Sequence, residues 1–298
     1  MSTRTEPVVA KPIPEAVSPW RRIAGGLHPL AAAAALVLML IVLVAILSPF
    51  MGTTDPRALA PMQRLKPPSE LYWLGTDQFG RDVWSRIVYG ARVSLTVGLA
   101  VAFASVLIGT LIGVGAGYVR WLDGTVMRVM DGLMSIPGIL LAIALVSLSG
   151  ASMLTVIIAI SVPEIPRVVR LVRSIVLSVR EEPYVEAAIS VGTPLPLLLW
   201  RHVLPNCVPP LIVQATYIAA SAMLTEAILS FLGAGTPPEI PSWGNMMAEG
   251  RTFFPIAPWI VLLPGVALAL TILCVNVLGD ALRDRLDPKV AKRMGGTQ

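Results

Sequence analysis

Long runs without a single charged residue constrain the fold of this chain more than any other feature. Residues 93–119 form one such run, and residues 132–163 form another. A membrane-spanning helix needs about 20 mostly apolar residues, and only helices or closed barrels satisfy the backbone inside a bilayer. Charged residues make up 14% of the chain, against about a quarter in soluble domains. The sequence therefore predicts a membrane protein built from helices.

The apolar runs together predict an all-α integral membrane protein with six transmembrane helices. We predict spans at residues 27–50, 93–119, 207–232 and 258–278, and two more inside 132–163, separated by a turn at 147–152. With both termini in the cytoplasm, most of the 23 Lys and Arg residues fall in cytoplasmic segments, as the positive-inside rule requires. Without the fourth span, the basic carboxyl-terminal tail would lie outside, so the charge distribution favours six spans.

The same interpretation divides the chain into four parts. Residues 1–26 are polar and proline-rich, which predicts a disordered cytoplasmic tail. Residues 27–90 combine the first span with an extracytoplasmic loop, which ends in an amphipathic helix expected to lie at the membrane interface. Residues 91–280 are expected to form the membrane core with the other five spans. Residues 281–298 are expected to form a second cytoplasmic tail.

The composition argues against several classes of function. The net charge is +5, but no basic stripe with interleaved aromatic residues occurs, so we expect no nucleic-acid partner. Cys207 and Cys274 lie at or within apolar segments and form no C-x-x-C pair, and the two histidines are far apart. We therefore expect neither a metal site nor catalytic residues. The sequence also lacks the G-x-x-x-x-G-K-[ST] pattern, so we expect no ATP site of that kind.

One stretch, residues 181–206, is apolar but too interrupted to be a single spanning helix. Proline is favoured at the first position of a helix, and Gly192 suits the left-handed residue that ends one. The pattern predicts a helix over 183–191, a corner, and a second helix over 194–204 that Pro205 ends. Eleven residues of helix reach about half the thickness of a bilayer, so we expect this hairpin on the cytoplasmic side.

An apolar hairpin on the cytoplasmic side needs a surface that covers it. Lipid headgroups are one candidate, and a partner protein is the other. Glu186 is unfavourable against anionic lipid, and the corner at Gly192 is tightly specified. Both details favour a partner protein.

The residues of this hairpin resemble a known motif. The pattern resembles the cytoplasmic EAA loop of permease subunits of binding-protein-dependent ABC importers. The residues that carry the likeness are Glu186, Ala187, Ala188, Gly192, His202, Leu204, Pro205 and Asn206. Three further stretches, residues 74–95, 230–251 and 276–288, resemble the C-type permease of dipeptide and oligopeptide importers. Together these likenesses cover most of residues 28–288.

The resemblance implies a type I ABC importer permease in a bacterial cytoplasmic membrane. Such a subunit would form half of a pathway for dipeptides or oligopeptides. Its implied partners are a homologous B-type permease, two ATPase subunits or one fused ATPase, an extracytoplasmic peptide-binding protein and membrane lipids. The ATPases would bind ATP and Mg, and this subunit would hold no cofactor and would not be an enzyme itself.

Two alternatives to peptide import remain open. The same machine could carry nickel, glutathione or another small solute. A secondary transporter driven by an ion gradient is more distant, because it would show internal repeats and paired charges within its spans, and neither is seen.

The resemblance also implies a role for each residue of the EAA loop. Glu186 would contact an ATPase through charge or hydrogen bonds, Ala187 and Ala188 would allow close approach, and Gly192 would set the corner. The return into the fifth span would be fixed by His202, Leu204, Pro205 and Asn206.

Five residues outside the hairpin are further candidates. Glu226 lies within a predicted span, where an acid is a functional suspect, and it either lines the pathway or hydrogen-bonds between helices. Asp77, Arg81 and Asp82 form either a structural turn or a contact for the binding protein, since their spacing fits no complete calcium site. Trp243 is expected to anchor at the membrane interface or to touch the docking protein.

Overall fold

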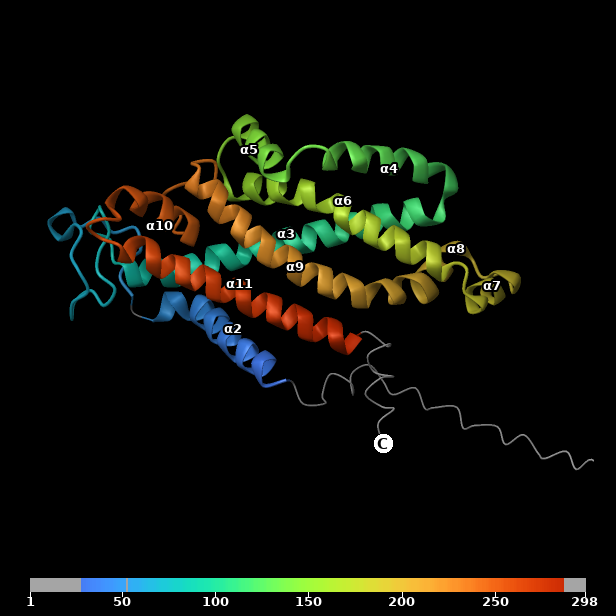
Figure 1. Ribbon diagram of the computed structural model, residues 1–298, viewed down its shortest axis with the longest axis horizontal. Helices are drawn as coiled ribbons and strands as arrows, with labels where there is room; N and C mark the ends of the chain where they lie inside the picture. Colours follow the sequence, from blue (N-terminus) through green and yellow to red (C-terminus); the bar gives the residue numbers. More distant parts are fainter. Residues whose placement is uncertain (1–27, 52, 287–298) are drawn as a thin grey trace, which may run out of the picture.

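The computed structural model describes residues 28–51 and 53–286 of the chain, and the regular elements of this part are helices (Figure 1). Our predicted tails at 1–26 and 281–298 therefore lie outside the described residues, except for residues 281–286. The main helices are α2 (Pro29–Leu47), α3 (Val83–Tyr118), α4 (Arg120–Met134), α5 (Gly138–Ser149), α6 (Met153–Val179), α7 (Pro183–Ser190), α8 (Leu195–Leu198), α9 (Leu204–Phe231), α10 (Trp243–Gly250) and α11 (Trp259–Leu286). Short turns are η1 (Ser48–Phe50), η2 (Pro61–Gln63), η3 (Leu199–Val203) and η4 (Arg251–Phe253).

Four of the described helical segments are long and apolar enough to cross a membrane. They are Pro29–Phe50, Val83–Tyr118, Leu195–Phe231 and Trp259–Leu286. The bent pair formed by α4 and α5, with an angle of 86° between its helices, is a fifth candidate. Helix α6 occupies the place of the predicted fourth span, but its charged residues keep it from qualifying by composition. The predicted turn at 147–152 is confirmed, because α5 ends at Ser149 and α6 begins at Met153.

Our prediction of a separate interfacial helix before residue 91 is wrong. It forms the first turns of α3, which continues without a break from Val83 to Tyr118. The side chain of Asp82 caps this helix by accepting a hydrogen bond from the Ser85 amide. Val83 is buried in a core shared by α2, α3, α9, α10 and α11, so tertiary packing rather than lipid covers this end of the helix.

Helices α3 and α6 pack closely along a stripe of glycines. A Cβ atom at Gly113 would lie 2.8 Å from the Cβ of Val172, and Gly109 and Gly117 meet α6 in the same way one turn away on either side. Small residues at every fourth position let two helix backbones approach within a membrane. This contact makes α3 and α6 the central pair of the bundle, with α9 packed against both.

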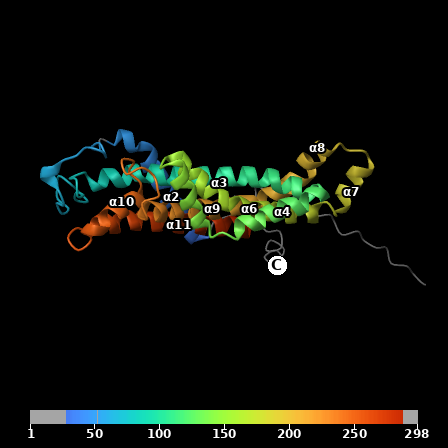
Figure 2. The same ribbon diagram turned by 90° about the horizontal axis from the view of Figure 1, so that it is seen from above.

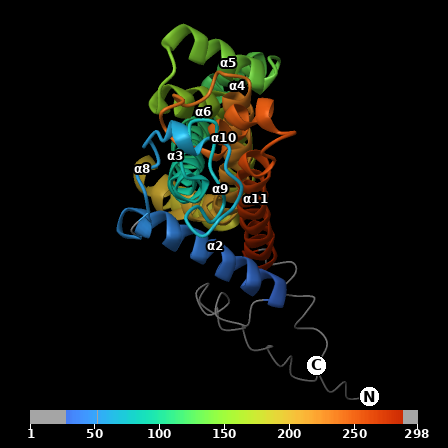
Figure 3. The same ribbon diagram turned by 90° about the vertical axis from the view of Figure 1, so that its left-hand side faces the viewer.

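The molecule is elongated, and its two ends differ in construction (Figures 1 and 2). At one end, α7, α8 and η3 project beyond the bundle; we call residues 183–206 the hairpin end. At the other end, residues 53–82 lie beside α10, as the view onto that end shows (Figure 3); we call these two segments the loop end. Helix α2 lies across one side of the bundle beside α11, and α4 and α5 lie on the opposite side.

Candidate functional site: a projecting hairpin

The first half of the hairpin end follows the rules for helix ends. Helix α7 begins at Pro183, where a missing amide hydrogen is tolerated. Gly192 has a φ of +84°, the left-handed conformation that favours glycine, and among the described residues no atom beyond its immediate neighbours lies within 4 Å of a Cβ placed there. The predicted first helix and the corner at Gly192 are thus confirmed.

The second half of the hairpin end corrects our prediction that Pro205 ends a separate helix. Helix α8 passes through the π-helical turn η3 directly into α9, so that Leu195–Phe231 is one helical segment. Pro205 lies in the first turn of α9 after the wider π turn, a position where proline is tolerated. The second half of the hairpin is therefore a continuous extension of a membrane helix.

Side chains at the base of the hairpin tie its two halves together. The Nδ2 atom of Asn206 donates to the hydroxyl of Tyr184 at 3.1 Å and to the carbonyl of His202 at 2.6 Å. The rings of Tyr184 and His202 also lie near each other, with centroids 6.1 Å apart. The expected bracing role of Asn206 and His202 is consistent with this geometry. Sequence reasoning did not identify Tyr184, whose place as the second residue of α7 was its only signal.

One face of the hairpin is buried and the other is open. Val185, Leu198 and Val203 are almost fully buried. Glu186 and Ala187 are exposed and Ala188 is half-buried. The open face also carries large apolar side chains, namely Tyr184, Ile189, Val191, Leu195, Leu197 and Trp200, with Val191 and Trp200 exposed by 87% and 74%.

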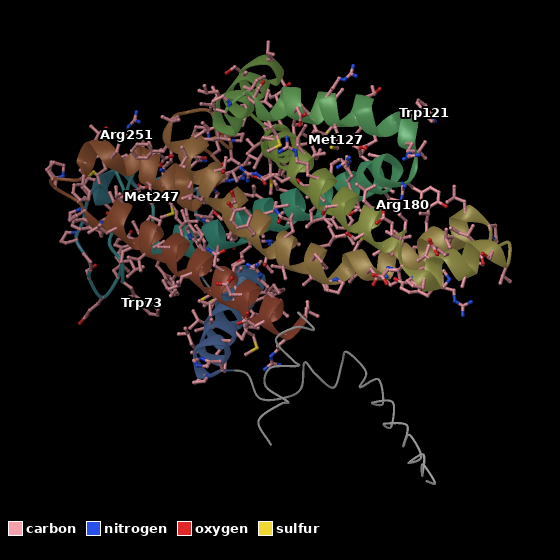
Figure 4. All side chains as sticks on the ribbon, turned by 45° about the vertical axis from the view of Figure 1, so that its right-hand side comes forward. Trp73, Trp121, Met127, Arg180, Met247 and Arg251 are labelled. Carbon is pink, nitrogen blue, oxygen red and sulfur yellow. The ribbon has the colours of Figure 1, made fainter. Side chains whose placement is uncertain are left out.

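Polar contacts connect the helices at the base of the hairpin. Arg180, where α6 gives way to the hairpin (Figure 4), donates a hydrogen bond from Nη1 to the carbonyl of Gly117 in α3 at 3.5 Å. On the same side of the bundle, α4 is joined to α6 by two ion pairs, Asp131–Arg170 at 2.5 Å and Asp123–Arg173. Asp131 and Asp123 thus both fasten α4 to α6.

The loop end holds Asp77 and Arg81 in a buried network of charges. Asp77 Oδ2 accepts hydrogen bonds from Arg81 at 2.5 Å and from Arg86 of α3 at 2.7 Å, while Oδ1 accepts from two backbone amides. Both arginines also pair with Glu249 of α10. Because Asp77 and Arg86 are each 2% exposed, this geometry fits a structural turn that binds the loop to the helices.

The other two candidates at the loop end also have structural contacts. Asp82 caps α3. Trp243, only 1% exposed, lies in the core, and its Nε1 atom donates to the carbonyl of Ile87 at 3.0 Å. Its expected place as an interfacial anchor is therefore wrong. A contact of Trp243, Asp77, Arg81 or Asp82 with a binding protein stays a prediction.

Glu226 is fully buried near the loop end of α9. Its Oε1 atom accepts hydrogen bonds from the hydroxyls of Ser230 at 2.8 Å, Ser242 at 2.9 Å and Thr236 at 3.2 Å. Ser242 in turn caps α10. This arrangement matches the hydrogen-bonding alternative between elements, and the pathway role of Glu226 stays a prediction.

The family of the chain follows from residues 78–292. They match the model of the family described as binding-protein-dependent transport system inner membrane component. The chain belongs to this family.

Several relatives from this permease family align with most of the chain. A probable peptide ABC transporter permease of Sinorhizobium fredii is 54% identical over 266 residues, which are 89% of this chain and 91% of the relative. A dipeptide transport system permease of Alkalihalophilus pseudofirmus is 42% identical and covers 92% of this chain and 91% of its own. A glutathione transport system permease of Pectobacterium atrosepticum is 40% identical over 91% of this chain and 90% of its own.

Solved structures support the same fold. A chain of a methionine ABC transporter in inward-facing conformations has a TM-score of 0.56 and 19% identity, and the match covers 68% of this chain and 96% of that chain. A chain of an amino acid ABC transporter has a TM-score of 0.52 and 12% identity, with 67% and 94% covered. This permease thus has the type I fold of ABC importer permeases.

Proposed function

We propose that this chain is the permease half of an ATP-driven importer of short peptides, with its hairpin end in the cytoplasm and its loop end outward. The carrying observation is the hairpin itself. It presents exposed apolar side chains beside Glu186 at the tip of a continuous membrane helix. Large apolar groups in water are unfavourable until a partner covers them. The relatives described as peptide permeases support the cargo.

The implied partners follow from the proposal. An ATPase subunit covers the open face of the hairpin, with Glu186 at the contact and Ala187 and Ala188 allowing close approach. A second permease completes the pathway, and a binding protein delivers peptide at the loop end. ATP and Mg bind to the ATPases. Closure of the ATPase pair pushes the hairpin, and α9 carries the movement into the membrane as a rigid body.

The glutathione relative supports one second candidate for the cargo. Glutathione is itself a short peptide, so the chemistry of recognition is related. Uptake of radiolabelled dipeptides, tripeptides and glutathione by the complete importer in proteoliposomes compares these candidates directly. Accumulation of none of them would contradict the proposed cargo.

The variant Gly192→Pro tests the hairpin as the coupling element. Proline fixes φ near −65°, so it cannot adopt the +84° found at this corner. We expect peptide uptake to fall at least about tenfold, because the hairpin no longer fits its partner; such a loss of rate corresponds to about 1.4 kcal/mol in activation free energy. The importer should then assemble poorly or hydrolyse ATP without transport.

The matched control is Gly192→Asn at the same position. Asparagine tolerates the left-handed conformation, and the open space around Gly192 accepts its side chain. We expect most of the coupled uptake to remain. Normal coupled uptake in Gly192→Pro would contradict the coupling role of the hairpin.

A further inference from the structure

A cavity of about 400 Å³ lies at mid-length of the bundle, between the bend of α4 and α5, α6 and α9. Its volume falls within the range of about 300–1,000 Å³ that is usual for small-molecule sites. Its polar lining comes from Glu164 and Arg167 of α6 and from the hydroxyl residues Tyr217, Ser221 and Thr225 of α9. A polar cavity at this depth in a membrane bundle requires an explanation.

The ion pair in this cavity is asymmetric. Arg167 Nη1 donates to both carboxylate oxygens of Glu164 at 3.0 Å. The Glu164 side chain is only 10% exposed, whereas the Arg167 side chain is 47% exposed. Within residues 28–51 and 53–286, the Nε and Nη2 atoms of Arg167 have no acceptor. Glu164 thus accepts hydrogen bonds from only one nitrogen of Arg167. The other two nitrogens are available to a ligand in the cavity.

Arg167 differs from the two arginines that follow it on α6. Arg170 and Arg173 pair with acids of α4 and so join two helices. Arg167 pairs only within its own helix, so its ion pair joins no elements. Arg167 lies near the middle of α6, and charged groups inside a membrane bundle are expensive and are usually retained for function. Arg167 is therefore the one member of this series whose structure points to a ligand.

The backbone of α6 adds to the polarity at the same level. Pro163 and Pro166 lie inside the helix and cannot donate to the carbonyls four residues earlier. Carbonyls freed in this way are tolerated at membrane depth where they line a water-filled cavity. The bend of α4 and α5 also packs here, since a Cβ atom at Gly138 would lie 3.1 Å from the Cβ of Pro163.

We propose that this cavity receives the carboxyl terminus of the passing peptide, with Arg167 as the binding residue and Glu164 as its positioning residue. The inference rests on the proposed function and adds a substrate subsite to it. A guanidinium fork matches a carboxylate with two parallel hydrogen bonds. The amino terminus of a peptide carries an ammonium group, which would need an exposed acid as its partner. Glu164 is the buried member of the ion pair, so the cavity does not favour the amino terminus. The hydroxyl of Tyr217 replaces water around the terminus.

Binding is tested by thiol protection in the complete importer without its binding protein. A cysteine is placed in the cavity wall by Ser221→Cys, and its labelling by a water-soluble thiol reagent is measured with alanylalanine or alanylalanine amide present. We expect the free acid to protect at a concentration about tenfold lower than the amide, since the amide lacks the charge-assisted bonds. The buried Cys207 and Cys274 provide the background, measured in the importer without the substitution.

Variants assign the effect to Arg167. In the Ser221→Cys background, Arg167→Gln should abolish the difference between acid and amide, and Arg167→Lys should retain part of it. Glu164→Gln should reduce the difference, because the guanidinium loses its orientation. Arg170→Gln, one turn further along, is the matched control and should leave the difference unchanged.

The outcomes separate this inference from the proposed function. Equal protection by acid and amide, or a difference that survives Arg167→Gln, would overturn the subsite. The comparison of acid with amide needs no Arg167 variant, so it remains decisive if Arg167→Gln does not assemble. Failure of the importer with its binding protein to accumulate any peptide would instead overturn the cargo.

Discussion

The loop end and the hairpin end of this permease differ in which side chains they bury and which they expose. The loop end buries two arginines against Asp77 and Glu249 and caps its helices with side chains. The hairpin end leaves large apolar side chains such as Trp200 in the open and relies on few bonds between its halves. Buried charges are tolerated only where they are well paired, whereas an exposed apolar patch marks a surface that a partner covers. The first end is therefore built for stability and the second for contact.

The largest expected effect is at the loop end, from Asp77→Ala. This change removes one of the two carboxylates, those of Asp77 and Glu249, that Arg81 and Arg86 share, and it removes the acceptor of two backbone amides. Breaking a buried pair from one side costs about 3–5 kcal/mol. Thermal unfolding of the purified importer should show a large loss of stability. Glu70→Ala, at an exposed acid of the same loop, is the control and should stay within about 0.5 kcal/mol. An unchanged melting temperature in Asp77→Ala would contradict the conclusion that the buried charges of the loop end stabilise the protein.

An intermediate effect is expected where α3 and α6 connect the two ends. In Gly113→Ala the new methyl group meets Val172, and such overpacking costs about 1–3 kcal/mol. In Gly115→Ala the new atom meets no contact within 4 Å in the part of the chain that the structure describes, so the better helix propensity of alanine should stabilise by up to about 1 kcal/mol. Melting temperatures that move in opposite directions support the close contact. Equal shifts would show that α3 and α6 do not pack through this stripe.

The smallest expected effect is at the hairpin end, from Tyr184→Phe. The change removes only the hydroxyl that accepts from Asn206, and hydrogen bonds of this kind contribute about 0.5–1.5 kcal/mol, with the lower value fitting a half-exposed site. Hydrogen exchange should quicken in α7 while the melting temperature of the importer stays the same. A fall in global stability would mean that the hairpin is part of the stable core, contrary to the comparison.

Local chemistry in the sequence predicted the features that depend on neighbouring residues. Proline at the start of α7 and glycine at its end follow from the conformations that these two residues allow, so the first helix and Gly192 were found correctly. The same rules failed at Pro205, because the π turn before it is a property of the whole segment from α8 into α9. Trp243 was misplaced for a related reason, since its partner at Ile87 is distant in the chain.

The sequence by itself determined that this chain crosses a membrane in helices, that the chain turns at 147–152 and at Gly192, and which motif contains Gly192. These properties depend on runs of apolar residues and on the φ angles open to glycine and proline. Only the tertiary structure decided which charges are structural and which face a cavity. Arg86 meets Glu249 across a long stretch of chain, while Arg167 and Arg170 look alike in sequence yet have different partners. Pairing between distant segments depends on packing, which residue spacing does not encode.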